Sequence, residues 1–376
     1  MRNIIVVGCG MVGSAIALDL AKEHNVTITD QNESALNKVI SKNNSIKAVA
    51  LNVRNETKLK ELIIPFDLVV CAVPGFLGYT ILRTIIDAGK NVVDISFFPE
   101  NALELDALAK RKNVTAIVDC GVAPGLDNII LGHYNEQIVI TGFECLVGGL
   151  PKIKKWPFNY KAPFSPVDVI EEYTREARFV ENGKIVVKEA LSDIELHEFE
   201  KIGTLESFNS DGLRSLIYTL PHIPNMKEKT LRYPGHRELI RALKESGFLN
   251  KQKIEINGLE ISPLEFTSKI LFDEWKLGDR EPEFTIMRIT IKGTDKKGGT
   301  QTIVYEIYDE YDEVTQTSSM SRTTGYTACS AVNLILNGMF TGKGVFPPEL
   351  VGKDENCFDF VLKYLKQRNI NVRKMS

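Results

Sequence analysis

The first third of the chain alternates short apolar runs with stretches in which apolar residues recur every three or four positions. The runs are typical of strands buried on both faces, and the periodic stretches are typical of amphipathic helices. The strand-like runs are NIIVVG, VTITD, IKAVALNV, DLVVCAVP, NVVDIS and TAIVDCG. The helical stretches fall near residues 11–22, 33–42, 56–63, 77–88 and 102–111. This alternation predicts an α/β domain with a parallel, doubly wound sheet of the Rossmann type.

The pattern changes after about Gly125, where hairpin signals replace helical crossovers. RFVENGKIVVKE carries Asn182-Gly183 between two strand-like runs, and FTIMRITIKGTDKKGGTQTIVYEIY predicts a second hairpin. From about Gly325, small and apolar residues at helical spacing predict a helix that rejoins the first domain. We therefore expect a first domain formed by residues 1–125 and 320–376, and an inserted mixed α+β domain formed by residues 126–319.

A glycine-rich turn follows the first predicted strand. GCGMVG places Gly8, Gly10 and Gly13 in the G-x-G-x-x-G spacing between a strand and a helix. The first glycine permits the tight turn, the second lets a pyrophosphate approach the backbone, and the third lets the helix pack on the strand. The N-terminus of that helix offers free N–H groups to the phosphates. Asp30, which ends the second strand, can bind both ribose hydroxyls and repel a 2′-phosphate, which favours NAD over NADP as the cofactor.

A plainer reading is that these glycines only make a turn and that Asp30 caps the next helix, but their position between strand and helix favours dinucleotide binding. The AVPG segment follows the fourth strand at the edge of the sheet where ligands bind, although its glycine is equally explained as an ordinary turn. The candidate cofactor-binding residues are Gly8, Gly10, Met11, Val12, Gly13, Asp30, Ala72, Val73, Pro74, Asp94 and Gly121.

The segment VDCGVAPGLDN stands where the sixth strand ends and the chain leaves the first domain, so we expect it beside the nicotinamide. Asp119, Cys120 and Asp127 can orient a substrate or water there. Equally, Pro124 and Gly125 can simply shape the turn, and Asp127 can be a helix N-cap.

Two later segments gather polar residues of catalytic type. SFNSDGLRSL carries Asp211 and Arg214, and TLRYPGH carries Arg232, Tyr233 and His236. An arginine binds a carboxylate through two parallel hydrogen bonds, so two arginines near Asp211 suit a zwitterionic amino acid, with Asp211 free for its ammonium. His236 is a candidate proton acceptor at neutral pH. Surface salt bridges and a packed histidine explain the same residues without function. The candidate catalytic residues are Asp119, Cys120, Asp211, Arg214, Arg232 and His236.

Composition narrows the class of protein. The chain has 376 residues, which favours two domains, and a formal net charge of −3 without long charged blocks. Such a balance gives no electrostatic footprint for nucleic acid or anionic lipid, so a small ligand is the expected partner. The apolar runs are too short to span a bilayer, and the opening residues lack a secretory pattern, so we expect a cytoplasmic protein with no membrane segment. Six scattered cysteines without CxxC predict reduced, mostly buried thiols and no metal site.

The ordered motifs VVGCGMVG, DISFFPE, VDCGVAPGLDNI, FNSDGLRSL, TLRYPGH and SRTTGYTACSAVNLIL resemble the saccharopine dehydrogenase family, most closely its lysine 6-dehydrogenase branch. The resemblance covers nearly the whole chain. It implies a Rossmann domain completed by the C-terminal segment, an inserted α/β catalytic domain, and commonly a homodimer. The segment TIVYEIYDEYDEV fits either a dimer seam or a covered strand of the sheet.

The resemblance also implies an activity: NAD-dependent oxidation at the ε-amine of L-lysine, which gives an imine that water converts to ammonia and 2-aminoadipate 6-semialdehyde, a product able to cyclise. Arg232 would then bind or order the substrate carboxylate, and His236 would be a candidate acid-base group. Hydride leaves a neutral amine more readily than an ammonium, so the enzyme must accept a proton before or during transfer.

Two alternatives stay open. A saccharopine or carboxynorspermidine dehydrogenase would join an amine to an aldehyde or keto acid by reductive condensation, and would need room and cations for a second acidic substrate. A non-catalytic sensor or scaffold would bind NAD alone, although Arg214, Arg232 and His236 beside an intact glycine motif argue against it.

Overall fold

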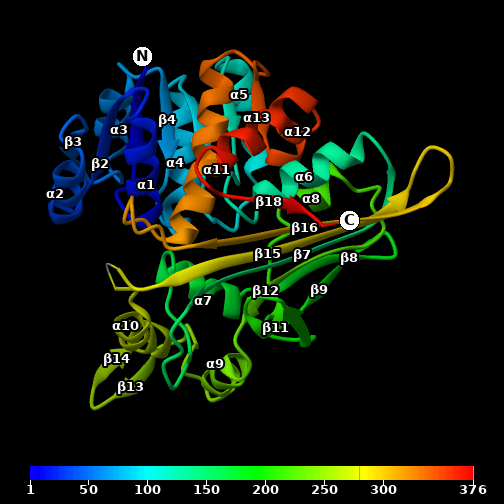
Figure 1. The fold of residues 1–376 in the computed structure, drawn as a ribbon. Coiled ribbons are helices and arrows are strands. Elements are labelled where there is room, and N and C mark those ends of the chain that lie inside the picture. The colour runs from blue at the N-terminus through cyan, green and yellow to red at the C-terminus, as the bar shows by residue number, and fades with distance from the viewer. Residues whose placement is uncertain (279, 376) are drawn as a thin grey trace.

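The computed structural model describes residues 1–278 and 280–375, apart from the side chains of residues 166 and 167. Two sheets organise the chain, one of seven strands and one of nine, with a separate two-stranded hairpin (Figure 1). None of the described helices combines the length and the apolar character needed to cross a bilayer.

The seven-stranded sheet is the predicted doubly wound sheet. Its strands are β1 (Asn3–Val7), β2 (Asn25–Asp30), β3 (Lys47–Ala50), β4 (Leu68–Cys71), β5 (Asn91–Asp94), β6 (Thr115–Ile117) and β17 (Gly344–Phe346). They lie in the order β17-β6-β5-β4-β1-β2-β3, and every pair is parallel. The order of the strands reverses between β1 and β4, the position at which open α/β sheets bind ligands.

Helices cover both faces of this sheet, as its mostly apolar and buried central strands require. They are α1 (Met11–Leu20), α2 (Glu33–Lys42), α3 (Glu56–Ile63), α4 (Gly75–Asp87), α5 (Asp106–Arg111) with the short η1 (Ala102–Leu105), α11 (Ser319–Leu336), α12 (Pro348–Gly352) and α13 (Glu355–Lys366). Residues of α1, α2, α11 and α13 share one apolar core, and residues of α3, α4 and α5 share the other. The predicted return of the C-terminal segment is therefore confirmed, although α11 begins at Ser319, before the expected Gly325.

The nine-stranded sheet is mixed. Its strands are β7 (Val139–Pro151), β8 (Ala177–Glu181), β9 (Lys184–Lys188), β10 (Glu195–Phe199), β11 (Gly203–Asn209), β12 (Met226–Arg232), β15 (Glu283–Thr294), β16 (Thr300–Glu310) and β18 (Val372–Lys374). Both predicted hairpins are present, as β8–β9 and β15–β16, while β12 runs parallel to β7. The last strand, β18, pairs with β16, so the end of the chain leaves the first domain and covers part of the strand considered as a dimer seam.

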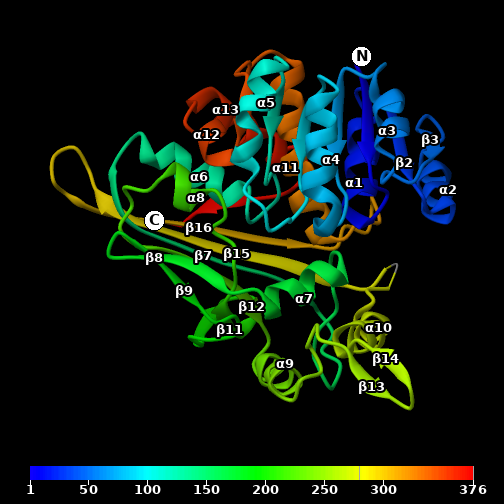
Figure 2. The ribbon, with the colours of Figure 1, turned by 180° about the vertical axis from the view of Figure 1, so that it is seen from behind.

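The remaining elements place the nine-stranded sheet between two layers. They are α6 (Leu126–Asn135), α7 (Pro166–Thr174), α8 (Leu216–Thr219), α9 (His236–Glu245), α10 (Pro263–Trp275) and the hairpin β13 (Ile254–Ile256)–β14 (Leu259–Ile261). Figures 1 and 2 show the Rossmann domain above the long strands and α7, α9 and α10 below them. Rossmann fold and inserted mixed domain are thus as the sequence predicts.

Candidate active site

A cavity of about 710 Å³ lies between the two sheets. On one side it is lined by residues that follow β1, β2 and β4, at the carboxyl edge of the Rossmann sheet. On the other side it is lined by residues of β7, α7 and β12 and by the loop after β11. The cavity therefore joins a nucleotide edge to a wall built by the inserted domain.

The glycine loop has the geometry that close approach of a dinucleotide requires. Gly8 has φ 109°, and a side chain there would meet the carbonyl oxygen of Ala72 at 2.2 Å. A side chain at Gly13 would meet the carbonyl oxygen of Gly8 at 2.2 Å, which is the close helix–strand packing expected of the third glycine. A side chain at Gly10 would meet nothing within 4 Å, so this backbone faces open space in the cavity wall.

No side chain caps α1, which starts directly after Gly10, so its first N–H groups remain available to phosphates. The Asp30 carboxylate accepts from the backbone N–H of Cys9 at 2.7 Å and of Asn32 at 2.9 Å, and it also lines the cavity. These two bonds fix the carboxylate beside the loop. The residues present thus fit a nicotinamide dinucleotide, with phosphates on the loop and a ribose near Asp30.

Ten of the eleven predicted cofactor-binding residues line this cavity, and the exception is Asp94. Asp94 is fully buried at the end of β5, where its carboxylate accepts from the N–H of Ser96 at 3.2 Å. Burial raises its pKa to about 7. Asp94, predicted to bind the cofactor, does not line the cavity because its side chain is fully buried, while its neighbours Ile95 and Ser96 do line it.

Strand β12 supplies the opposite wall through alternate residues. Glu228, Thr230 and Arg232 line the cavity, whereas Lys227 and Lys229 between them do not. This is the period of two that a strand imposes on its side chains. TLRYPGH is therefore the end of a strand and the turn into α9, and only its arginine and threonine reach the cavity.

Arg232 is 2% exposed and is held from several directions. Its guanidinium donates to Glu172 at 2.8 Å, to Tyr173 Oη at 3.1 Å and to Tyr160 Oη at 3.3 Å. It also lies over the Tyr160 ring, 4.5 Å from the centroid. A fourth bond runs from Nη1 to the carbonyl oxygen of Leu231 at 2.9 Å, so these four bonds leave one of the five guanidinium N–H groups for a substrate carboxylate.

His236 lies behind this arginine and does not line the cavity. Its Nδ1 is 2.9 Å from the carbonyl oxygen of Phe158, which can only accept, so Nδ1 carries the proton and Nε2 accepts from Tyr173 Oη at 2.9 Å. Burial, together with the Arg232 charge, lowers its pKa to about 3. The structure therefore contradicts a direct proton-accepting contact with substrate, because His236 orients Tyr173 and through it Arg232.

Asp119 lines the cavity, but Arg214 and Cys120 do not. The Arg214 guanidinium donates to Asp119 Oδ1 at 2.8 and 3.1 Å and to the carbonyl oxygen of Phe98. Asp119 and Arg214 both have positive φ, 51° and 50°, a backbone conformation that costs about 1–2 kcal/mol for a residue with a side chain. Arg214 thus positions Asp119 and does not present its guanidinium to a ligand.

Cys120 points away from the cavity into the Rossmann core, where Sγ lies 4.0 Å from the carbonyl oxygen of Thr327. Burial raises the pKa of its thiol, which makes it a poor nucleophile or base. All six cysteines are buried and free, as predicted.

Asp211 lines the cavity but is already paired. Arg178 of β8 donates to both carboxylate oxygens at 2.9 Å, and its backbone N–H donates at 3.2 Å. The expectation of an Asp211 carboxylate free for an ammonium is therefore wrong, because β8 brings in an arginine that the sequence motif did not include.

Family comparisons agree with this architecture. The profile described as "Saccharopine dehydrogenase NADP binding domain" matches residues 4–117, and that described as "Saccharopine dehydrogenase C-terminal domain" matches residues 121–370. The chain belongs to the saccharopine dehydrogenase family. Its cavity lies where these two matched domains meet.

Relatives within the saccharopine dehydrogenase family are distant in sequence. The fission yeast saccharopine dehydrogenase [NADP(+), L-glutamate-forming] is 27% identical over 72% of this chain and 64% of its own length, so the chain spans less than two thirds of that relative. Carboxyaminopropylagmatine dehydrogenase from Synechocystis is 21% identical over 94% of both chains. The solved saccharopine dehydrogenase (L-Glu forming) from Saccharomyces cerevisiae has a TM-score of 0.80 at 19% identity, covering 100% of this chain and 99% of its own, which shows the shared fold.

Sequence reasoning missed most of the acidic groups in the wall of this family member. Glu171, Glu172 and Asp168 come from α7, and Glu228 comes from β12. Burial raises the pKa of each of Asp168, Glu172 and Glu228, that of Asp168 to about 6. The alternation of Glu228 with Thr230 and Arg232 along a strand was the one sequence signal that could have found Glu228.

Proposed function

We propose that this protein is a nicotinamide-dependent amine dehydrogenase that oxidises the ε-amine of L-lysine to 2-aminoadipate 6-semialdehyde, with release of ammonia. The observation that carries the proposal is the charge of the substrate half of the cavity. Its acidic side chains are Asp119, Asp168, Glu171, Glu172, Asp211 and Glu228, against two basic ones, Arg175 and Arg232.

Both basic residues already have acidic partners in the wall. Arg175 lies 3.4 Å from Glu171, and Arg232 lies 2.8 Å from Glu172. Arg178 and Arg214, from behind the wall, pair with Asp211 and Asp119, so the acidic groups of the wall that have no cation partner among the described residues are Asp168 and Glu228. These two carboxyl groups suit a ligand rich in ammonium groups. Lysine carries two ammonium groups and one carboxylate, whereas saccharopine carries three carboxylates that would need additional cations. This balance favours lysine over the condensed substrate.

The wall can bind the two ends of lysine differently. Arg232, whose donors are fixed by Tyr160, Tyr173 and Glu172, would hold the α-carboxylate. The carboxyl groups would hold the ammonium groups, and one that has no cation partner would accept the proton that the ε-ammonium must lose before hydride transfer. The dinucleotide, when bound, accepts the hydride from the ε-carbon.

We propose NAD as the cofactor, because the Asp30 carboxylate, which ends β2 and lines the cavity beside the glycine loop, would repel a 2′-phosphate. The matched domain is described as NADP binding, and the fission yeast relative is named for NADP. The substitution Asp30→Ser tests this point directly. It should lower the ratio of kcat/KM with NAD to kcat/KM with NADP by about 10-fold or more, equivalent to about 1.4 kcal/mol.

A second candidate is a carboxylated polyamine as substrate. It is favoured by the match over 94% of both chains to carboxyaminopropylagmatine dehydrogenase, and an acidic wall suits such a cation equally well. The reductive condensation of a carboxynorspermidine dehydrogenase also involves a carboxylated polyamine. We further propose a homodimer on the basis of the family resemblance, which sedimentation of the purified protein tests. A cytoplasmic location is proposed from the sequence pattern, and fractionation of cells that express the protein tests it.

Turnover of purified protein tests the proposal. L-lysine, saccharopine, ornithine and a carboxylated polyamine are offered one at a time with NAD or NADP, and reduced nicotinamide is followed by absorbance. Reduction with lysine and NAD is expected. Turnover of saccharopine or the polyamine alone would refute the lysine assignment, and silence with every substrate while NAD still binds would favour the sensor hypothesis.

A further inference from the structure

Glu228 differs from the other carboxylates of the cavity wall in having no hydrogen bond or ion pair among the described residues. It lines the cavity and is 3% exposed, and its Oε2 atom is buried without a partner. The carboxyl group fits against the backbone of Gly212, where any side chain would meet Glu228 Oε1 at 1.9 Å. A buried carboxylate without a partner is costly, so its presence in a ligand cavity calls for a functional explanation.

A second carboxyl group, that of Asp127, and the thiol of Cys145 lie next to Glu228. One carboxylate oxygen of Asp127, one of Glu228 and the Sγ atom of Cys145 all lie within 4.8 Å of one another, and all three residues are buried. Cys145 is the register partner of Glu228 across the parallel β7–β12 pair, and Asp127 stands in the first turn of α6. Asp127 Oδ1 accepts from the N–H of Gly125 at 2.9 Å, but its Oδ2 is buried without a partner.

The charges around this cluster do not neutralise it. Glu228 faces Asp127 from α6, Glu172 from α7 and Asp211 from the loop after β11, and the opposing charge is that of Arg214. Glu349 of α12 faces Asp127 from behind, and it is itself bonded to Asn128 and Thr219. Two carboxylates so close in a dry site cannot both be ionised, so the Glu228–Asp127 pair retains a proton at neutral pH. Burial raises the pKa of both, that of Asp127 to about 7.

The other carboxylates of the wall have assigned partners. Asp119 is bound by Arg214, Asp211 by Arg178, Glu172 by Arg232 and Glu171 by Arg175. Asp168 accepts from the N–H of Gly75 at 3.3 Å. Each of these groups is held by a donor or cation, which makes it a weaker base than a carboxylate without one.

We propose that Glu228 is the catalytic proton acceptor of this site, with Asp127 and the Cys145 thiol behind it holding the remaining proton of the pair. This inference rests on the proposed amine oxidation. In the step, an N–H bond of the substrate ammonium breaks and an O–H bond forms on the Glu228 carboxylate, leaving a neutral amine whose lone pair can form the C=N bond as hydride departs to the nicotinamide. The proton on Glu228 is the one that the overall reaction releases, and water later converts the imine to aldehyde and ammonium.

The test compares Glu228→Gln with wild type on whichever amine the wild type oxidises. We expect kcat/KM to fall by about 100-fold or more at neutral pH, with a smaller change in KM, and the residual rate to rise steadily with pH because the substrate must then lose its proton to solvent. A small carboxylate such as formate should restore part of the activity of Glu228→Ala. A bell-shaped profile in Glu228→Gln like that of wild type, or no rescue of Glu228→Ala, would overturn the proposal.

Glu206→Gln is the matched control. Glu206 lies on the neighbouring strand β11, is 8% exposed and has a buried Oε1 without a partner, but it does not line the cavity. It should retain wild-type turnover.

A chelation experiment tests the alternative that the cluster binds a metal. Loss of activity on chelation, restored by Zn²⁺, would make Asp127, Cys145 and Glu228 metal ligands and overturn the proton-acceptor role.

Infrared spectra of the protein without cofactor give a readout that needs no turnover. The difference between the wild-type and Glu228→Gln spectra should contain a protonated-carboxyl C=O band that disappears on raising the pH, and a difference spectrum without that band would overturn the assignment. If the wild type oxidises no amine, the proposed function fails; if it does and Glu228→Gln is equally active, only the present inference fails.

Discussion

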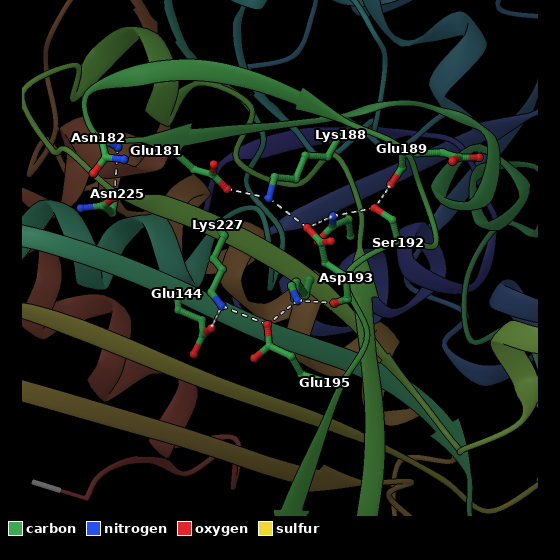
Figure 3. A network of polar contacts seen from close by, with 12 residues as sticks. Glu144, Glu181, Asn182, Lys188, Glu189, Ser192, Asp193, Glu195, Asn225 and Lys227 are labelled. Atoms are coloured by element: carbon green, nitrogen blue, oxygen red, sulfur yellow. Dashed lines mark hydrogen bonds and ion pairs between the residues drawn. The ribbon is translucent and has the colours of Figure 1, made fainter.

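The two faces of strand β12 differ in how completely their charged side chains are paired. On the face turned from the cavity, Lys227 lies 2.6 Å from Glu144 and 3.3 Å from Glu195, and Lys229 lies 2.6 Å from Glu195 (Figure 3). The network continues through Asp193 and Lys188, which lie 2.9 Å apart. On the cavity face, one residue further along, Glu228 has no partner.

The difference between the two faces separates charges that support the fold from charges kept for chemistry. On the outer face, each lysine has carboxylate partners, and the network stays in contact with solvent. On the cavity face, carboxylates exceed cations and several have a raised pKa. These groups lower the free energy of unfolding, and interactions elsewhere in the fold must offset that loss. The comparison therefore predicts that removing a cavity carboxylate that has no cation raises the free energy of unfolding, whereas removing a buried cation from either face lowers it.

The largest effect is expected at the one cavity cation that is fully buried. Arg232→Ala would leave Glu172 without its cation and remove the proposed carboxylate anchor. We expect the free energy of unfolding to fall by about 3–5 kcal/mol, and kcat/KM to fall by about 10- to 100-fold, mainly through KM. Urea unfolding and steady-state kinetics measure the two effects.

A double variant separates stability from binding at this position. Arg232→Met combined with Glu172→Gln removes both charges of the pair, so much of the stability should return while the high KM persists. An unchanged KM in the double variant would mean that Arg232 serves the fold alone.

Removing the charge of a cavity carboxylate should instead raise the free energy of unfolding. Burial raises the pKa of Asp168 to about 6, above its usual value of 3.8, so the folded protein keeps the proton over a range in which the unfolded chain loses it. The stability from this group is full below about pH 4 and is lost as the pH rises to about 6. Asp168→Asn cannot ionise and should be more stable than wild type at pH 7 by up to about 3 kcal/mol, with little gain at pH 4.

Denaturant unfolding at both pH values measures this difference. Asp273→Asn, on an exposed carboxylate of α10, is the control and should leave the pH dependence unchanged. A parallel pH dependence in wild type and Asp168→Asn would contradict the idea that cavity carboxylates cost stability.

The sequence predicted the fold well where the pattern was local. Apolar runs and helical periodicity identified the strands and helices of the Rossmann sheet, and the glycine motif with Asp30 located the cofactor edge, because each of these features depends on residues close in the chain. The domain boundaries at 125 and 320 stay a prediction. The first sheet does include β17, but β18 returns to the second one.

The catalytic wall was harder to predict because it is built from distant segments. KEKTLR carries polar residues on both faces of its strand, so it shows no apolar alternation. The ion-pair partners also come from distant segments, Glu172 for Arg232 and Arg178 for Asp211. His236 seemed suited to proton transfer by its residue type alone. Packing places it behind Tyr173, where it supports Arg232.

The smallest effects are expected on the outer face of β12, where two lysines differ in burial. The Lys229 side chain is 2% exposed and also donates to the carbonyl oxygen of Asp193 at 2.5 Å, whereas that of Lys227 is 36% exposed. Lys229→Met should lower the free energy of unfolding by about 1–2 kcal/mol because the Asp193 carbonyl and the Glu195 carboxylate both lose a donor. Lys227→Met should change it by less than about 1 kcal/mol because its pairs are exposed to solvent. Both variants should keep wild-type kcat/KM in the amine oxidation assay. Both lysines alternate with Glu228 along one strand. A loss of activity in Lys227→Met comparable to that in Glu228→Gln would therefore show that the two faces of β12 are not independent. The distinction between charges that support the fold and charges that serve the reaction would then be wrong.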